Sequence, residues 1–201
     1  MKKLLSLVIL LLLPSAILKA GTPRITWGLE WGYTATMLKT SQHNFICDEG
    51  YRIIENPVTW RYFSNGSVLA CAGADITEHI NLSAYTGLQG VYSRRWVVPA
   101  MLRMKWSPSG LRSDGFMLIA GGGHVFPTTT LRETGMETQA GVAYRIAFIR
   151  GLSVDLLLTW NFTLDWENIT DPDTRKLVPR TNITNNSTEY QALNLSIALN
   201  F

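Results

Sequence analysis

Residues 190–201 read YQALNLSIALNF, and side chains of two different kinds alternate along this segment. An alternation with a period of two is typical of a β-strand whose two faces meet different surroundings. One face carries Gln191, Leu193, Leu195, Ile197, Leu199 and Phe201, and the other carries Tyr190, Ala192, Asn194, Ser196, Ala198 and Asn200. We therefore predict a strand with one apolar and one more polar face.

The same alternation recurs along the chain, and no segment after residue 20 has the spacing of an amphipathic helix. It is clear in residues 27–37, 81–92, 95–106, 138–148 and 152–163. Two further segments, 67–75 and 115–125, are rich in glycine and alanine, so their phase stays open. Together these segments predict eight strands of roughly 9–13 residues. That is longer than strands in most globular sheets and close to the length that crosses a bilayer at a tilt.

The polar faces carry charges of both signs in mid-strand. A soluble β-protein would turn such residues outward, whereas a membrane barrel turns apolar residues outward and encloses polar ones. Trp96 and Trp106 lie ten residues apart on one apolar face, which is about 33 Å of extended chain. After tilting, this matches the two aromatic girdles of a membrane barrel. We predict an all-β, eight-stranded antiparallel up-and-down transmembrane β-barrel with an interior polar cluster of Glu30, Gln89, Arg103, Lys105, Arg145 and Asp155.

Composition supports a folded, exported chain. Of 201 residues, 46% are hydrophobic and 16% are charged, which excludes a largely disordered protein. Two cysteines are too few for a disulfide scaffold. Lys2 and Lys3 precede an apolar run that ends in small residues at Ala20 and Gly21, the pattern of a secretory signal peptide. We predict a signal peptide over 1–20 and a barrel domain over 21–201, and the loss of three lysines would leave a neutral domain poorly suited to nucleic acid.

The lengths of the connectors predict an orientation. Residues 39–65, 127–137 and 164–189 form long connectors, and tight turns separate the other strands. Bacterial barrels have short periplasmic turns and longer external loops. We therefore expect both ends of the barrel domain on the periplasmic side and the three long connectors outside.

The terminal strand carries a resemblance to a known group. With Leu193, Leu195, Ile197 and Leu199 leading to Phe201, the chain resembles the small outer-membrane barrels of Bacteroidetes, similar to the outer-membrane protein A-like and PorT-like barrel domains. The segment CDEGYR at 47–52, followed by SNG at 64–66, is also similar to such barrels. The resemblance implies that the barrel-assembly machinery recognises this strand. It further implies an outer-membrane location in contact with lipid and lipopolysaccharide.

Signals for catalysis are weak. His124 lies near Thr128 at the outward end of its strand, His43 lies in the first long connector, and His79 lies in a turn, but no serine follows His124 as a nucleophile would. Gly121–Gly123 lacks the lysine of a phosphate-binding loop. The three histidines are too scattered for a metal site. We predict no catalytic, cofactor or metal site, and pairing of Cys47 with Cys71 stays open.

The leading hypothesis is a non-enzymatic outer-membrane barrel with an interior plugged by side chains, which serves envelope integrity or surface contact through its external loops. A barrel-embedded lipid A-modifying enzyme and a soluble lipocalin-like ligand-binding barrel are the alternatives, and a narrow gated pore is a further variant of the first. In the first long connector, Tyr51, Trp60, Tyr62 and Phe63 could contact sugars or a partner, or pack against the last loop. Oligomeric state cannot be predicted.

Overall fold

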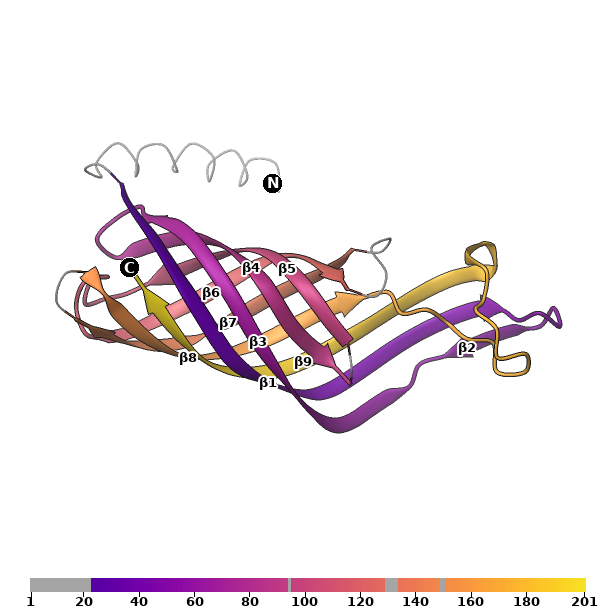
Figure 1. Ribbon diagram of the computed structural model, residues 1–201. Coiled ribbons are helices and arrows are strands. Elements are labelled where there is room, and N and C mark those ends of the chain that lie inside the picture. Colours follow the sequence, from indigo (N-terminus) through magenta and orange to yellow (C-terminus); the bar gives the residue numbers. More distant parts are fainter. Residues whose placement is uncertain (1–22, 94, 129–133, 149–150) are drawn as a thin grey trace, which may run out of the picture.

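The computed structural model describes residues 23–93, 95–128, 134–148 and 151–201 (Figure 1). The predicted signal peptide at 1–20 lies outside these residues, as do the first two residues of the predicted barrel domain. Within the described ranges, no helix is both long enough and apolar enough to cross a membrane.

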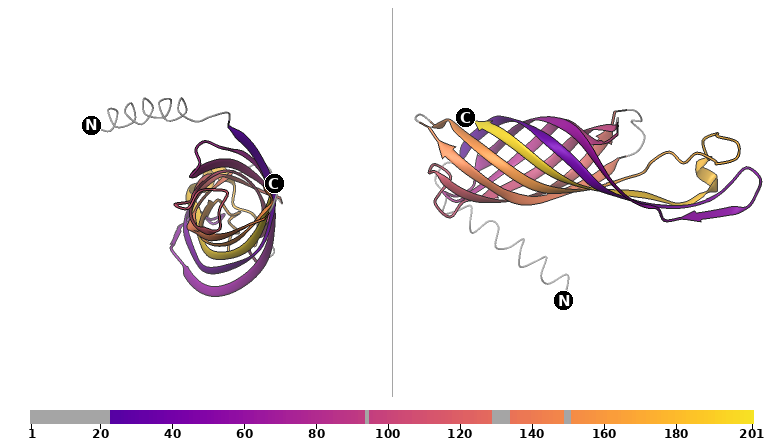
Figure 2. Two further views of the ribbon diagram at one scale, coloured as in Figure 1. Left: turned by 90° about the vertical axis from the view of Figure 1, so that its left-hand side faces the viewer. Right: turned by 90° about the horizontal axis from the view of Figure 1, so that it is seen from below.

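The described chain forms one antiparallel sheet in which strands that follow each other in sequence are also neighbours in space. Pairing between β1 and β9 closes the sheet, and the short β2 pairs with β1 outside the ring. Viewed from one end, the strands surround a common axis (Figure 2). The strands are β1 (Arg24–Ile46), β2 (Arg52–Glu55), β3 (Val58–Asp75), β4 (Ile80–Tyr92), β5 (Arg95–Trp106), β6 (Gly115–Pro127), β7 (Gly135–Ala147), β8 (Ser153–Asp165) and β9 (Ile183–Asn200).

The register of the ring is staggered, as closure of a barrel requires. A path that starts at Gly28 and follows directly paired residues runs through each strand in turn and returns to β1 at Lys39, further along the same strand. The intermediate partners are Cys71, Tyr85, Met101, Gly123, Glu137, Thr163 and Tyr190. The predicted eight-stranded, antiparallel up-and-down barrel fold is therefore confirmed.

The barrel wall has an apolar outer face and a mostly polar inner face, as the alternation predicts. Outward-facing positions are occupied by large apolar residues that remain exposed, such as Leu156 and Leu195. Inward-facing positions are buried and mostly polar. The two segments of open phase are now assigned: Ser67, Leu69 and Cys71 of β3 point inward, and Met117 and Ile119 of β6 do the same.

Inward-facing glycines let neighbouring strands approach closely. A Cβ atom on Gly123 would lie 2.2 Å from the carbonyl oxygen of Ala100 on β5, which is closer than atoms can pack. At Gly122, which points outward, the nearest atom is 3.3 Å away. The glycine run 121–123 therefore serves wall packing, because a side chain at Gly123 would push two strands apart.

The prediction that residues 39–65 and 164–189 are loops is wrong for much of their length. β1 continues to Ile46, β3 already begins at Val58, and β9 already begins at Ile183. These strands therefore exceed the predicted length. β3 pairs with β4 only from Ser67 onward, and β9 pairs with β8 only from Thr188 onward. Residues 38–46, 52–55, 58–64 and 183–188 therefore project beyond the ring as a narrow sheet, called the arm here (Figures 1 and 2).

The remaining connectors define the two ends of the barrel. The connectors 76–79 and 107–114 and the described residues 148, 151 and 152 lie at the end that also holds Arg24 and Asn200, called the turn end. The opposite arm end holds the arm and the connector 166–182 between β8 and β9. In the predicted connector 127–137, Pro127 ends β6 and Gly135 begins β7, whereas 129–133 lie outside the described residues.

Candidate functional site

The centre of the barrel is crossed by a buried ion pair. Arg103 on β5 donates a hydrogen bond through Nη1 to Glu30 on β1, and a second through Nη2 to Gln139 at 3.0 Å. Ser196 donates to the other Glu30 oxygen at 2.9 Å. The Arg103 guanidinium also lies 3.9 Å from the ring centroid of Tyr85, a cation–π contact. Strands on opposite sides of the ring are thereby connected through side chains.

A second ionic layer lies closer to the turn end. Asp155 on β8 accepts two hydrogen bonds from its cross-strand neighbour Arg145, at 2.7 and 2.8 Å, and a third from Lys105 at 3.1 Å. Asn200 donates to the same carboxylate at 3.0 Å. Because a buried charge is destabilising unless it is paired and hydrogen-bonded, these contacts satisfy Asp155 and much of the two cations.

The layer nearest the arm end centres on Glu137. This carboxylate is buried and accepts hydrogen bonds from Gln89 at 2.9 Å and from Asn161 at 2.9 Å. The six residues of the predicted interior cluster are all buried in the barrel, but the prediction leaves out Glu137 because it starts this strand at 138. The missed signal was the alternation itself, which continues backward from Gln139 through Glu137 to Gly135.

Apolar side chains pack in the interior near both ends of the barrel. At the arm end, Val91, Val97, Val125 and Tyr190 form a buried cluster across the mouth. Toward the turn end, Leu111 from the β5–β6 connector packs with Met117, Ile119, Ala143, Leu157 and Ala198. The Leu111 carbonyl accepts a hydrogen bond from Arg145. The interior is therefore a filled core, as expected for a barrel of eight strands.

A polar clamp fastens the β8–β9 connector to the base of the arm. Glu167 accepts hydrogen bonds from Lys39 of β1 at 2.7 Å and from the Tyr190 hydroxyl of β9. Burial opposes ionisation of Glu167, but the bonds from Lys39 and Tyr190 outweigh it and hold its pKa below the ordinary value. Beneath the same connector, burial lowers the pKa of His43. We call Lys39, Glu167 and Tyr190 the mouth clamp.

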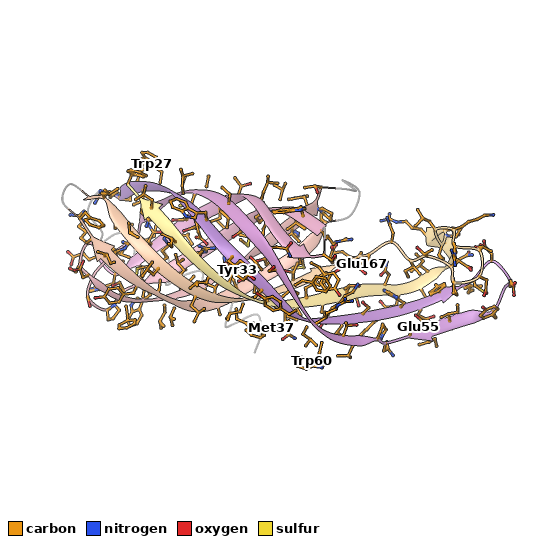
Figure 3. The ribbon with its side chains drawn as sticks, turned by 60° about the horizontal axis from the view of Figure 1, so that its bottom comes forward. Trp27, Tyr33, Met37, Glu55, Trp60 and Glu167 are labelled. Atoms are coloured by element: carbon orange, nitrogen blue, oxygen red, sulfur yellow. The ribbon has the colours of Figure 1, made fainter. Side chains whose placement is uncertain are left out.

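The arm has one covered and one open face. Its covered face packs Phe45 and Cys47 against Ile169 and Val178 of the β8–β9 connector. Asp171 of that connector accepts a hydrogen bond from the backbone of Asp48 at 2.9 Å. In Figure 3, Glu167 lies on this covered side and Trp60 on the opposite one.

The four aromatic residues of the first predicted connector divide between these environments. Tyr51 donates a hydrogen bond to Asp173 of the β8–β9 connector, and Phe63 packs against the Tyr92 ring at 4.3 Å. Trp60 and Tyr62 are 77% and 61% exposed on the open face, together with Val58. Tyr51 therefore contacts the last connector, as one interpretation expects, whereas the side chains of Trp60 and Tyr62 are exposed.

The histidines and cysteines do not assemble a reaction centre. His124 is exposed on the outer wall of β6, close to the end of that strand at Pro127, and its side chain points away from the interior. His79 lies with Nδ1 2.8 Å from the Ser107 carbonyl, which ties two turns together. Cys47 and Cys71 are free thiols. Among the described residues, no group of three or more histidine, cysteine or acidic side chains is placed to hold a metal ion.

No family model and no curated protein matches the chain. Among solved structures, the chain is similar to the outer membrane protein OprG from Pseudomonas aeruginosa, with 10% identity over 90% of this chain and 98% of that one and a TM-score of 0.49. It is also similar to Neisserial surface protein A (NspA), with 10% identity over 85% of this chain and 95% of that one and a TM-score of 0.33. At these values we draw no functional conclusion from either likeness.

Proposed function

We propose that this protein is a non-enzymatic, sealed β-barrel of the bacterial outer membrane that carries the arm on the outer side of the cell for surface contact. The observation that carries the proposal is the inversion of the usual globular pattern. The wall exposes large apolar residues all round, and the interior holds the paired charges of Glu30, Arg103 and Asp155.

Aromatic residues support a lipid-facing belt. Trp106 and the stacked pair Trp27 and Phe201 are near the turn end, whereas Trp96 is at the other end of β5. Figure 3 places Trp27 on the outside of the wall at that end. Girdles of this kind flank an apolar band about 25 Å tall in membrane barrels. A soluble lipocalin-like barrel would instead place its apolar residues around an interior ligand cavity.

Connector lengths support the orientation. The short connectors at the turn end would face the periplasm, and the arm would stand outside the outer leaflet. In this arrangement lipid and lipopolysaccharide surround the belt, and Val58, Trp60 and Tyr62 stand at the outer edge of that layer. The barrel-assembly machinery would recognise the terminal strand by its outward side chains, which are Leu193, Leu195, Ile197, Leu199 and Phe201.

The filled interior supports a role without transport. The apolar cluster at the mouth lies across the arm end, and the charged side chains of the Glu137 layer and of the Arg103–Glu30 pair are buried beneath it. Open diffusion pores are built from many more strands. Liposomes that contain the refolded protein should therefore remain impermeable to small sugars. Swelling in sugar solutions at a porin-like rate would contradict a sealed barrel.

Fractionation tests the location, and lipid analysis tests the absence of enzyme activity. The protein should fractionate with the outer membrane and migrate faster when unheated than when boiled, and protease added to intact cells should cleave the arm. Recovery as a detergent-free soluble protein would contradict the proposal. A deletion strain should keep an unchanged lipid A mass profile, whereas a loss of one lipid A modification would favour the enzyme alternative.

A further inference from the structure

A cavity of about 260 Å³ opens at the turn end of the barrel, below the Asp155 layer. Its volume is slightly under the range of common small-molecule pockets, so it suits a small ligand or a single headgroup. The cavity is lined by inward-facing strand residues at the turn end, called the barrel floor here, and by residues of the neighbouring turns. Its charged lining residues are Arg24, Asp75, Lys105, Arg112 and Arg145.

Positive charge is in excess at this cavity. Among the side chains of the described lining residues, four are cationic and that of Asp75 is the one carboxylate. Asp155, which lies just behind the lining, pairs with Lys105 and Arg145. Asp75 accepts a hydrogen bond from Asn81 at 2.8 Å. Counting Asp75 and Asp155, the side chains at the site carry an excess of two positive charges.

The two outer arginines supply this excess. Within the parts of the chain that the structure describes, the side chains of Arg24 and Arg112 have no ion-pair or hydrogen-bond partner, although the backbone of Arg24 is paired with Asp75 in the sheet. The Arg24 guanidinium nevertheless lies across the mouth of the cavity, since a Cβ atom on Gly151 of the β7–β8 turn would be 2.2 Å from its Nη2. Unpaired cations held at a partly enclosed site attract an anion more strongly than cations in open water.

The inner cations keep donors available. Lys105 has three N–H donors, and it donates to Asp155 at 3.1 Å and to Asn200 at 3.2 Å. Arg145 has five N–H donors, of which three serve Asp155 and the Leu111 carbonyl. Both side chains can therefore donate to a further acceptor without breaking the bonds that hold Asp155.

We propose that this cavity binds a phosphate group, with Arg24 and Arg112 closing over it from outside and Lys105 and Arg145 donating from the barrel floor. A phosphate monoester carries a charge between −1.5 and −2 near neutral pH, which matches the excess charge of the site. Planar guanidinium groups suit its oxygens. The phosphate could belong to a soluble compound or to the headgroup of a lipid in the adjacent leaflet.

Cys71 lines the cavity and reports on its occupancy. Lipid-free protein in non-ionic detergent at low salt would be treated with an anionic or a cationic methanethiosulfonate reagent, and modification of Cys71 would be measured by peptide mass spectrometry. The anionic reagent should react several-fold faster, and inorganic phosphate should protect Cys71. Cys47, which is 2% exposed, is the internal control.

Matched variants separate the site from general charge. In R24Q/R112Q, phosphate should bind about tenfold or more weakly by calorimetry and the preference for the anionic reagent should disappear. R52Q/K176Q removes two exposed cations at the arm end and should bind as the wild type does. Single variants R24Q and R112Q keep the test available if the double variant does not fold.

Micelles doped with phosphatidic acid, whose headgroup is a phosphate monoester, identify the source of the phosphate, with phosphatidylcholine as the control lipid. Protection by free phosphate alone assigns a soluble ligand, and protection by phosphatidic acid assigns a headgroup. The proposal is overturned if neither probe protects Cys71, or if R24Q/R112Q binds phosphate as tightly as the wild type.

Discussion

Arg103 and Glu30 form an ion pair across the centre of the barrel, and each side chain is only 1% exposed. They come from β5 and β1, which do not pair with each other in the sheet. The pair therefore joins distant parts of the wall through the interior. Its energetic role can be measured separately from that of the backbone ladder.

Removing one partner of this pair should be strongly destabilising. E30Q or R103M should lower the free energy of unfolding by about 3–5 kcal/mol, because each leaves the other charge buried without compensation. The double variant E30Q/R103M should recover much of that loss. Urea unfolding of refolded protein in detergent micelles gives the three values, and additive losses would show that the two side chains do not interact.

A positive charge on the outer wall should lower the free energy of unfolding by an amount that depends on its depth in the bilayer. L158R places arginine on the outward face near the middle of β8 and should cost about 2–4 kcal/mol in a bilayer. Q42R, on the exposed part of the arm, is the matched control and should be nearly neutral. Unfolding in vesicles of defined thickness measures both. Equal costs at the two positions would argue against a lipid-facing wall.

The glycine run of β6 allows a comparison between neighbouring positions. G123A should destabilise the barrel by about 1–3 kcal/mol, since its methyl group would overlap the Ala100 carbonyl of β5. G122A adds the same methyl group on the outer side, where the nearest atom is 3.3 Å away, and should be tolerated. Thermal unfolding in detergent compares them, and the reverse order would contradict the assigned faces of β6.

Acid should release the β8–β9 connector from the arm. The lowered pKa of His43 means that its contribution is complete above the ordinary value of about 6.5 and is lost as the pH falls below it. The lowered pKa of Glu167 adds a contribution that is complete above about 4.3 and is lost as the pH falls through the shifted value.

Hydrogen exchange in residues 166–182 should therefore accelerate in two steps as the pH is lowered, after correction for the intrinsic pH dependence of exchange. In E167Q the lower step should be absent and the upper one retained. Corrected exchange that does not change as the pH falls well below about 4.3, the ordinary pKa of a glutamate, would contradict the role of the mouth clamp.

Much of the barrel could be predicted from sequence because its two faces meet opposite environments. Alternation along 95–106 predicts both the strand and the inward direction of Arg103 and Lys105. Glycine and alanine carry little of this signal, so the phase of 67–75 and 115–125 required the register with neighbouring strands.

The arm and the cavity at the turn end show why the rest could not be predicted. Beyond the ring the β8–β9 connector covers one face of β1 and the other face is open, so neither face meets lipid. Residues such as Gln42 and Asn44 therefore break the apolar alternation while the backbone ladder continues. The cavity at the turn end brings together Arg24, Arg112 and Arg145 from three separate segments, and no local pattern indicates that they meet.

The most direct test of the account asks which solvent the outer wall meets. A nitroxide label would be placed at Leu195 or at Gln42 in a background that lacks Cys47 and Cys71, and its collisions with oxygen and with a water-soluble nickel chelate would be measured in bilayers. We predict high oxygen and low nickel accessibility at Leu195, with the opposite result at Gln42. Nickel accessibility at Leu195 as high as at Gln42 would contradict a wall that faces lipid.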